Sequence, residues 1–153
     1  MHHKNTRRAT SLGYRVSRLY RLNSCLLDCW LNEHHFSSGQ IPYIMATVEK
    51  PGQTQEQLSA YIRVCPAAIA RTLKNMEASG LVRRDENPEN RRQKLVYPTS
   101  EAEALYSTLI PILDRHNEVM LEGFSDEEKV QIGAMLDRIA TNVQKELNGE
   151  RDK

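Results

Sequence analysis

The 153-residue chain contains few cysteines, no glycine-rich loop and no long apolar run. Its three cysteines, Cys25, Cys29 and Cys65, are too few for a disulfide framework, and none forms a Cys-x-x-Cys pair or zinc-finger spacing. No stretch approaches the ~20 apolar residues that span a bilayer, and the first residues lack the apolar core of a signal peptide. No Ser/His/Asp or paired-carboxylate arrangement stands out. We therefore expect a cytoplasmic protein that is not an enzyme and needs no membrane, metal or cofactor.

Basic residues are concentrated in the middle of the chain, although the formal net charge is only +1. Residues 63–94 contain eight Arg or Lys against four acidic residues, whereas residues 100–150 contain eleven acidic residues against four basic ones. Such a basic segment can offer one face to a polyanion while the rest of the protein stays soluble. Charge alone does not separate this interpretation from a solvated surface with chance clustering.

Apolar residues recur at helical spacing along most of the chain. Thr54 and Gln57 have the spacing of a capping box, and Pro66 suits the first position of a helix. Gly80 is a typical helix stop, and Ser125 precedes three acidic residues that favour a helix N-terminus. These patterns predict six helices: about 11–33, 40–49, about ten residues from Thr54, from Pro66 to Gly80, from Thr99 or Ser100 with Pro111 inside, and from Ser125.

The segment "LVRRDENPENRRQKLVYP" changes from helical to short, mixed periodicity. Pro88 suits the second position of a tight turn, so the segment predicts a two-stranded hairpin with a charged tip. An irregular charged loop is the alternative.

Two short helices followed by a basic hairpin make a winged helix-turn-helix. The predicted buried stripes are Leu58, Tyr61 and Ile62 on the first helix, and Ile69, Leu73 and Met76 on the second. The major groove of DNA admits one α-helix, whose N-terminal residues reach base edges. The outward positions of the second helix are then Ala67, Ala68, Ala70, Arg71, Lys74 and Asn75.

These positions carry chemistry that suits DNA. Ala67 and Ala68 let the helix sink deep and can contact thymine methyls, while Arg71 reaches a guanine or a phosphate. Lys74 suits a phosphate. Arg91 and Arg92 at the hairpin tip can enter the adjacent minor groove, where the potential is most negative.

The stretch "TQEQLSAYIRVCPAAIARTLKNMEASGLVRRDENPENRRQKLVYPTSEAEAL" resembles the core of the MarR family of bacterial transcriptional regulators. The resemblance covers roughly residues 10–148. It implies a mainly α fold with a small β-hairpin wing (α+β), in which flanking helices form a dimerisation region. It also implies a homodimeric repressor that a small ligand or oxidant releases from DNA. The implied DNA-contacting residues are Gln55, Cys65, Ala67, Ala68, Arg71, Lys74, Asn75, Arg84, Arg91, Arg92 and Lys94.

The chain departs from the family pattern at the wing and on the recognition helix. Asn87 and Asn90 stand where aspartates are usual, one of which orients a wing arginine, and Ala102 replaces the glycine after the wing. Ala67 and Ala68 replace Ser or Thr. These differences leave room for an alternative function, a winged-helix protein-interaction module without specific DNA binding.

The outer helices carry more apolar surface than one small core can bury. A two-fold dimer would cover the excess and place two recognition helices ~34 Å apart, so an inverted-repeat site in double-stranded DNA is expected. The expected regions are 37–99 for DNA binding, 10–36 and 100–148 for dimerisation, and flexible tails at 1–9 and 149–153. The excess apolar residues are Leu19, Leu26, Trp30, Leu109, Leu113, Leu136, Ile139 and Val143.

The sequence leaves the releasing agent open. Cys25 and Cys29 lie one helical turn apart and Cys65 lies at a helix cap, so each is a redox candidate, although two small buried residues near the dimer interface are the favoured interpretation of the first pair. Trp30, His34 and His116 are candidates for the ligand pocket that the resemblance implies. His34, His35 and His116 also suggest a metal site, but surface histidines are the favoured interpretation because no pair has a diagnostic spacing.

Overall fold

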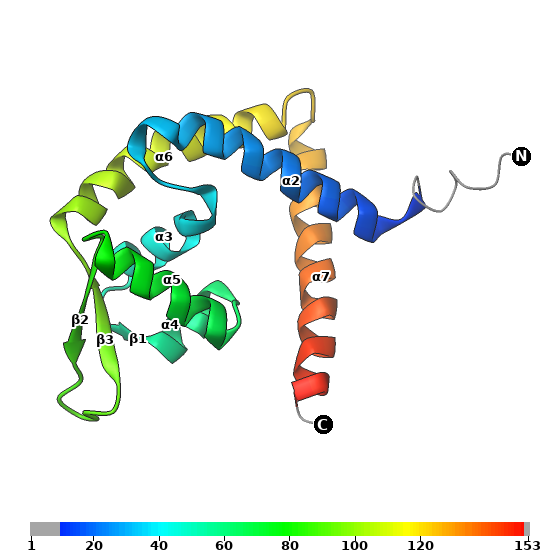
Figure 1. Ribbon diagram of the computed structural model, residues 1–153. Coiled ribbons are helices and arrows are strands. Elements are labelled where there is room, and N and C mark those ends of the chain that lie inside the picture. The colour runs from blue at the N-terminus through cyan, green and yellow to red at the C-terminus, as the bar shows by residue number, and fades with distance from the viewer. Residues whose placement is uncertain (1–9, 152–153) are drawn as a thin grey trace, which may run out of the picture. The chain divides into compact units, whose positions relative to one another are not determined.

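The computed structural model describes residues 10–151 (Figure 1), and the chain divides into two compact units, residues 1–112 and 113–153. The fold is mainly helical with a small antiparallel sheet, as the sequence predicts. The predicted tail 1–9 and residues 152–153 lie outside the described residues, and residues 149–151 of the predicted tail 149–153 are helical instead.

Four helices precede the sheet hairpin in the first unit, and two of them, the first and the third, begin at side-chain caps. Ser11 Oγ accepts the N–H of Tyr14 at the start of the first helix. Thr54 and Gln57 form the predicted capping box, with N···O distances of 3.2 and 2.9 Å. The four helices are α2 (Leu12–Leu31), α3 (Ile41–Glu49), α4 (Gln55–Ile62) and α5 (Pro66–Ala78), and the short 3₁₀ segments η1 (Asn32–His34) and η2 (Ser38–Gln40) connect α2 to α3.

The sheet has three strands rather than the predicted two. β2 (Val82–Glu86) and β3 (Lys94–Pro98) form the predicted hairpin, with Arg84 opposite Val96. A short strand, β1 (Gln53–Thr54), pairs antiparallel with the other edge of β3. The chain between α3 and β1 makes this possible, because the Gly52 N–H donates to Val96 O at 2.9 Å and brings β1 into register.

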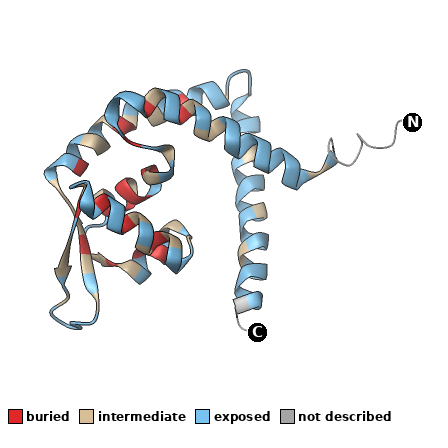
Figure 2. Ribbon diagram, in the orientation of Figure 1, coloured by how far each residue is buried: buried red, intermediate tan, exposed pale blue. Residues whose placement is uncertain are grey.

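The core of the first unit lies between the short helices and the inner face of the sheet (Figure 2). Leu58 on α4 is buried as predicted, but Tyr61 is 43% exposed, so its assignment to the buried stripe is wrong. Its hydroxyl donates to Glu49 Oε2 at 3.4 Å and Lys50 Nζ lies 4.2 Å from its ring centre, which hold the side chain at the surface. The other fully buried residues include Ile44, Ile69, Leu73, Met76 and Val96.

The turn between α4 and α5 consists of residues 63–65. Arg63 ends α4 in the left-handed region with φ of 55°, a conformation that non-glycine residues adopt at a cost. Ser59 compensates by donating its hydroxyl to Val64 O at 2.7 Å, and Ser59 O accepts the Val64 N–H. This turn sets the direction in which α5 leaves α4.

The helix α6 (Ser100–Met120) begins at Thr99, whose hydroxyl accepts the N–H of Ala102 at 3.3 Å and donates to Gly80 O at 2.7 Å. Thr99 therefore links the start of α6 to Gly80, just after the end of α5. Pro111 is accommodated within the helix. Leu109 is fully buried, so its assignment to an exposed apolar surface is wrong.

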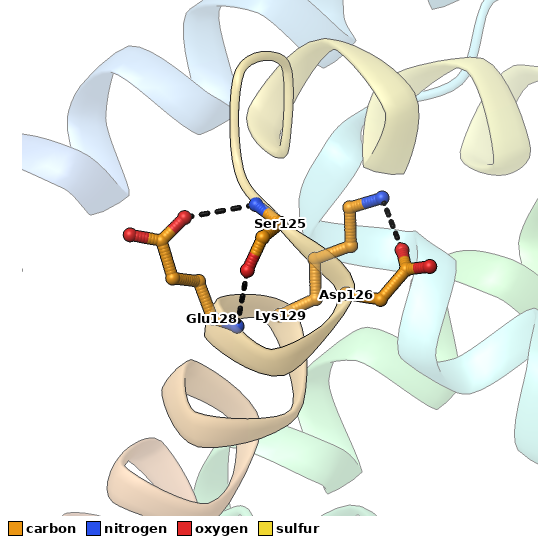
Figure 3. A network of polar contacts seen from close by, with 4 residues as sticks. All are labelled: Ser125, Asp126, Glu128 and Lys129. Atoms are coloured by element: carbon orange, nitrogen blue, oxygen red, sulfur yellow. Dashed lines mark hydrogen bonds and ion pairs between the residues drawn. The ribbon is translucent and has the colours of Figure 1, made fainter.

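The second unit includes α7 (Asp126–Arg151). Ser125 and Glu128 form a capping box: Ser125 Oγ accepts the Glu128 N–H at 3.2 Å and Glu128 Oε2 accepts the Ser125 N–H at 2.8 Å (Figure 3). An ion pair between Lys129 and Asp126 lies beside it. Most of the apolar side chains along α7 are exposed, among them Met135, Leu136 and Val143.

Candidate nucleic-acid interface

The recognition helix α5 has a buried face and an opposite exposed face. Ile69, Leu73 and Met76 are completely buried, as their spacing predicts. The exposed face carries Ala67, Arg71, Lys74 and Asn75, whereas Ala68 and Ala70 are half-buried rather than fully outward. The exposed face therefore combines a small residue at its front with two cations one turn and two turns further on.

The start of α5 is formed by Cys65 and Pro66. Cys65 is exposed, and its backbone carbonyl accepts the N–H groups of Ala68 and Ile69 at 3.0 and 3.2 Å. Its thiol makes no capping hydrogen bond, so backbone geometry rather than a side-chain cap defines this end. Gln55, the first residue of α4, is half-buried.

The wing tip consists of two successive turns, each begun by an asparagine. Asn87 O accepts the Asn90 N–H, and Asn90 O accepts the Gln93 N–H, at 3.1 and 2.9 Å. The side chains repeat this pattern, because Asn87 Oδ1 accepts the Glu89 N–H and Asn90 Oδ1 accepts the Arg92 N–H, at 3.0 and 3.1 Å. An aspartate has the same acceptor oxygen, so asparagine preserves the turn geometry at both positions where the chain departs from the family.

The tip displays Arg91 and Arg92 side by side (Figure 1 shows the tip at the free end of β2 and β3). Both side chains are exposed, and neither forms an ion pair with any residue in the range 10–151. Lys94, at the start of β3, is exposed as well.

Arg84 is placed differently from the other basic candidates. Its guanidinium forms an ion pair with Glu77 near the end of α5, in which Nε donates to Glu77 Oε2 at 2.9 Å and Nη2 reaches the same oxygen. The pKa of Glu77 lies below its usual value, chiefly because of this hydrogen bond. The pair joins β2 to α5. The sequence prediction of Arg84 as a DNA contact did not anticipate this partner, although Glu77 lies seven residues earlier.

Arg83, the preceding residue, is also engaged. It forms an ion pair with Asp85, and its guanidinium carbon lies 4.5 Å from the centre of the Tyr97 ring. Both contacts fix Arg83 along the wing.

Comparisons with known proteins identify this arrangement. The MarR family model matches residues 40–94, which span α3 to the start of β3. The chain is 32% identical over 108 residues to the uncharacterized HTH-type transcriptional regulator YybA of Bacillus subtilis (strain 168), covering 71% of this chain and 72% of that protein. The chain belongs to the MarR family.

Solved structures share the fold of this MarR family chain over most of its length. The crystal structure of the transcriptional regulator SlyA matches with a TM-score of 0.84 and 26% identity, covering 90% of this chain and 96% of that one. A MarR family regulator from Listeria monocytogenes, solved in complex with a 26mer DNA, matches with a TM-score of 0.82 and 24% identity, covering 90% and 91%. The chain is thus a DNA-binding transcriptional regulator with a winged helix, and its family consists of regulators rather than enzymes.

The ligand-pocket candidates Trp30, His34 and His116 lie outside the wing. In the first unit Trp30 is half-buried on α2 and His34 is exposed in η1. His116 lies in the second unit, where it is 6% exposed, so its assignment to the surface is wrong; burial lowers its pKa and favours the neutral imidazole.

The cysteines Cys25 and Cys29 are exposed in the single chain rather than buried. Across residues 10–151, no three His, Cys, Asp or Glu side chains are grouped so that they could hold a metal ion. None of the helices in the same range is long and apolar enough to span a membrane.

Proposed function

We propose that this MarR family regulator acts as a homodimeric, sequence-specific repressor, with α5 in the major groove and the wing tip in the adjacent minor groove of an inverted-repeat site. The observation that carries this proposal is a set of exposed cations along α5 and the wing that form no ion pair with any residue in the range 10–151.

The charges of this surface support the proposal. Of the eight basic residues between positions 63 and 94, two have acidic partners, Arg83 with Asp85 and Arg84 with Glu77. The other six are exposed and form no ion pair with any described residue. Cations that form no ion pair are available to phosphates, and each phosphate neutralised releases condensed counterions. The six are Arg63, Arg71, Lys74, Arg91, Arg92 and Lys94.

The individual roles follow from position along the helix and wing. Ala67, near the N-terminus of α5 and exposed, suits contact with a thymine methyl, and Arg71 one turn later suits a guanine or a phosphate. Lys74 suits a phosphate that positions the helix. Arg91 and Arg92 suit the narrow minor groove. Because Arg84 forms an ion pair with Glu77, we assign Arg84 to positioning the wing against α5 rather than to contacting DNA.

The homodimer rests on the apolar residues that the single chain leaves exposed. The N-terminal half of α2 exposes Leu12, Val16 and Leu19, and α7 exposes Leu136 and Val143. A second copy would bury these side chains and provide the second recognition helix. We assign residues 37–99 to DNA binding and residues 10–36 and 100–148 to dimerisation. We further propose that a small ligand or an oxidant releases the DNA, as is common in the family.

The test is a titration of the DNA upstream of the protein's own gene at two salt concentrations, compared with a random duplex. We expect Arg71→Ala to weaken binding by about 1–3 kcal/mol if it reads a base. Arg91→Ala should weaken binding and lower the salt dependence by about one phosphate. Lys145→Ala is the matched control, because Lys145 is an exposed cation on α7.

The outcomes separate the two function classes. Tight, salt-sensitive binding that Arg71→Ala and Arg91→Ala weaken, and that Lys145→Ala leaves unchanged, would support the repressor. Binding to the upstream DNA no tighter than to the random duplex, by a folded dimer, would favour a protein-interaction module instead.

A further inference from the structure

We propose that Cys25 and Cys29 form a two-thiolate site for a soft metal ion of low coordination number, of which Cu(I) is the biological example. Both residues lie in α2, outside the DNA-binding surface, and both thiols are free and exposed. Nothing in the proposed repressor function uses them as a metal site.

The spacing of the two cysteines favours a bridging atom over a direct bond. They are four residues apart in a continuous helix, so their Cβ atoms lie roughly 5–6 Å apart. A disulfide needs a Cβ–Cβ separation of about 3.5–4.5 Å. A metal ion with metal–sulfur bonds of about 2.3 Å places two sulfur atoms as much as about 4.6 Å apart, which side chains on one helical face can reach. Two thiols at this spacing therefore chelate an ion more readily than they oxidise to each other.

In the single chain, both thiols of the pair are open to solvent. The buried residues of α2 are Leu27 and Leu31, and both cysteines are exposed, so they lie away from the buried face of α2. An ion can therefore reach both sulfurs without any rearrangement of the core.

The number of donors selects the kind of ion. Within residues 10–151, no third His, Cys, Asp or Glu joins the pair to form a metal-binding group. A tetrahedral zinc site needs more protein ligands than two. Thiolates are soft donors that select ions such as Cu(I), and a two-coordinate ion needs no further ligand. On binding, each thiol loses its proton to solvent and the oxidation state of the sulfur does not change.

The site lies beside the connection from α2 to α3, where the proposed DNA-binding region begins. Asp28, between the two cysteines, accepts the N–H of Ser38 at 2.7 Å through Oδ1. Ser38 begins η2, which leads directly into α3. An ion that bridges Cys25 and Cys29 would hold the helical turn that carries Asp28.

The experiment is an anaerobic titration of the reduced full-length protein with Cu(I). The readout is the thiolate-to-copper charge-transfer absorption in the ultraviolet, which imidazole ligands do not produce. The wild type is compared with Cys25→Ser, Cys29→Ser and Cys65→Ser. The last variant is the matched control, because Cys65 is an exposed thiol that lies alone at the start of α5.

We expect the absorption to reach its end point at one ion per chain in the wild type and in Cys65→Ser, and to be lost in Cys25→Ser and in Cys29→Ser. Circular dichroism of the four metal-free proteins checks that serine leaves α2 folded. An end point that Cys65→Ser abolishes, an equal response in all four proteins, or one ion per two chains would overturn the proposal. Intact mass after mild oxidation provides a second test, since an intrachain Cys25–Cys29 disulfide would contradict the spacing argument.

Discussion

At the scale of single residues, Gly52 is held in a conformation that favours glycine. Its φ is +80°, and an added Cβ would lie 3.1–3.3 Å from atoms of the Tyr97 side chain. We expect Gly52→Ala to lower the free energy of unfolding by about 2 kcal/mol or more, because the left-handed conformation alone costs about 1–2 kcal/mol. Urea denaturation of the purified variant measures the change.

Gly80 provides the comparison for this prediction. Its φ is +76°, but nothing lies within 4 Å of the position that a Cβ would take. Gly80→Ala should therefore show the conformational cost without the crowding, and be the milder of the two substitutions. Equal losses would mean that the Tyr97 ring moves aside freely.

At the scale of elements, the Arg84–Glu77 pair fastens the wing to the recognition helix. The Arg84 guanidinium keeps the pKa of Glu77 below its usual 4.5. The stabilisation is therefore fully present above about pH 4.5, and is lost as the pH falls through the lower pKa of the folded state. Because both side chains are partly exposed, water screens the pair, and its contribution is below about 1 kcal/mol.

We predict that Glu77→Gln is slightly less stable than the wild type at pH 7 and that this difference shrinks below pH 4.5. Urea midpoints at both pH values measure it. Glu86→Gln is the control, since Glu86 is exposed on the same strand as Arg84 and has no ion pair with a described residue. A difference that grows on acidification would contradict the assignment of Arg84 and Glu77 as a stabilising pair.

The wing tip allows a separate prediction, because asparagine side chains order it. Asn90→Ala removes the acceptor of the Arg92 N–H without changing any charge. We expect DNA binding to weaken by about 0.5–1.5 kcal/mol, the value of one hydrogen bond, as the tip loses order. The dependence of affinity on salt should stay at the wild-type value, whereas Arg91→Ala should lower it by about one phosphate. A reduced salt dependence in Asn90→Ala would mean that the asparagine affects the number of phosphate contacts directly.

At the scale of the whole molecule, the exposed apolar residues of α2 and α7 predict the oligomeric state. Leu19 and Leu136 are 54% and 50% exposed in the single chain. We expect Leu19→Glu and Leu136→Glu to shift the protein from dimer to monomer, because a buried, unpaired carboxylate is costly. Analytical ultracentrifugation measures the shift, and Gln131→Glu, at an exposed polar position of α7, is the control.

The loss of the dimer should also reduce DNA binding. Two linked recognition helices gain avidity of roughly 10²–10⁴ over one. The monomeric variants should therefore bind an inverted repeat no better than a single half-site. A wild type that sediments as a monomer would remove the basis of the inverted-repeat prediction.

The helices and the wing hairpin could be predicted from the sequence because their determinants are local. The capping box at Thr54, the helix cap at Ser125, Pro66 at a helix start and Gly80 at a helix end each act within a few residues, and each is confirmed. The buried face of α5 was equally predictable, since helical periodicity assigns Ile69, Leu73 and Met76 to one side. The DNA-binding function followed from the order of these elements and the basic residues that accompany them.

The tertiary structure decided which side chains find partners from distant segments. Tyr61 has the spacing of a core residue, yet Glu49 and Lys50 on another helix end hold it at the surface. Strand β1 exists because β3 offers it an edge, and Arg84 is engaged because the fold turns β2 back toward Glu77. The sequence by itself determined where elements begin, end and face inward, because those choices depend on neighbours along the chain. Only the folded structure decided which charges pair and which stay available to DNA, because those choices depend on neighbours in space.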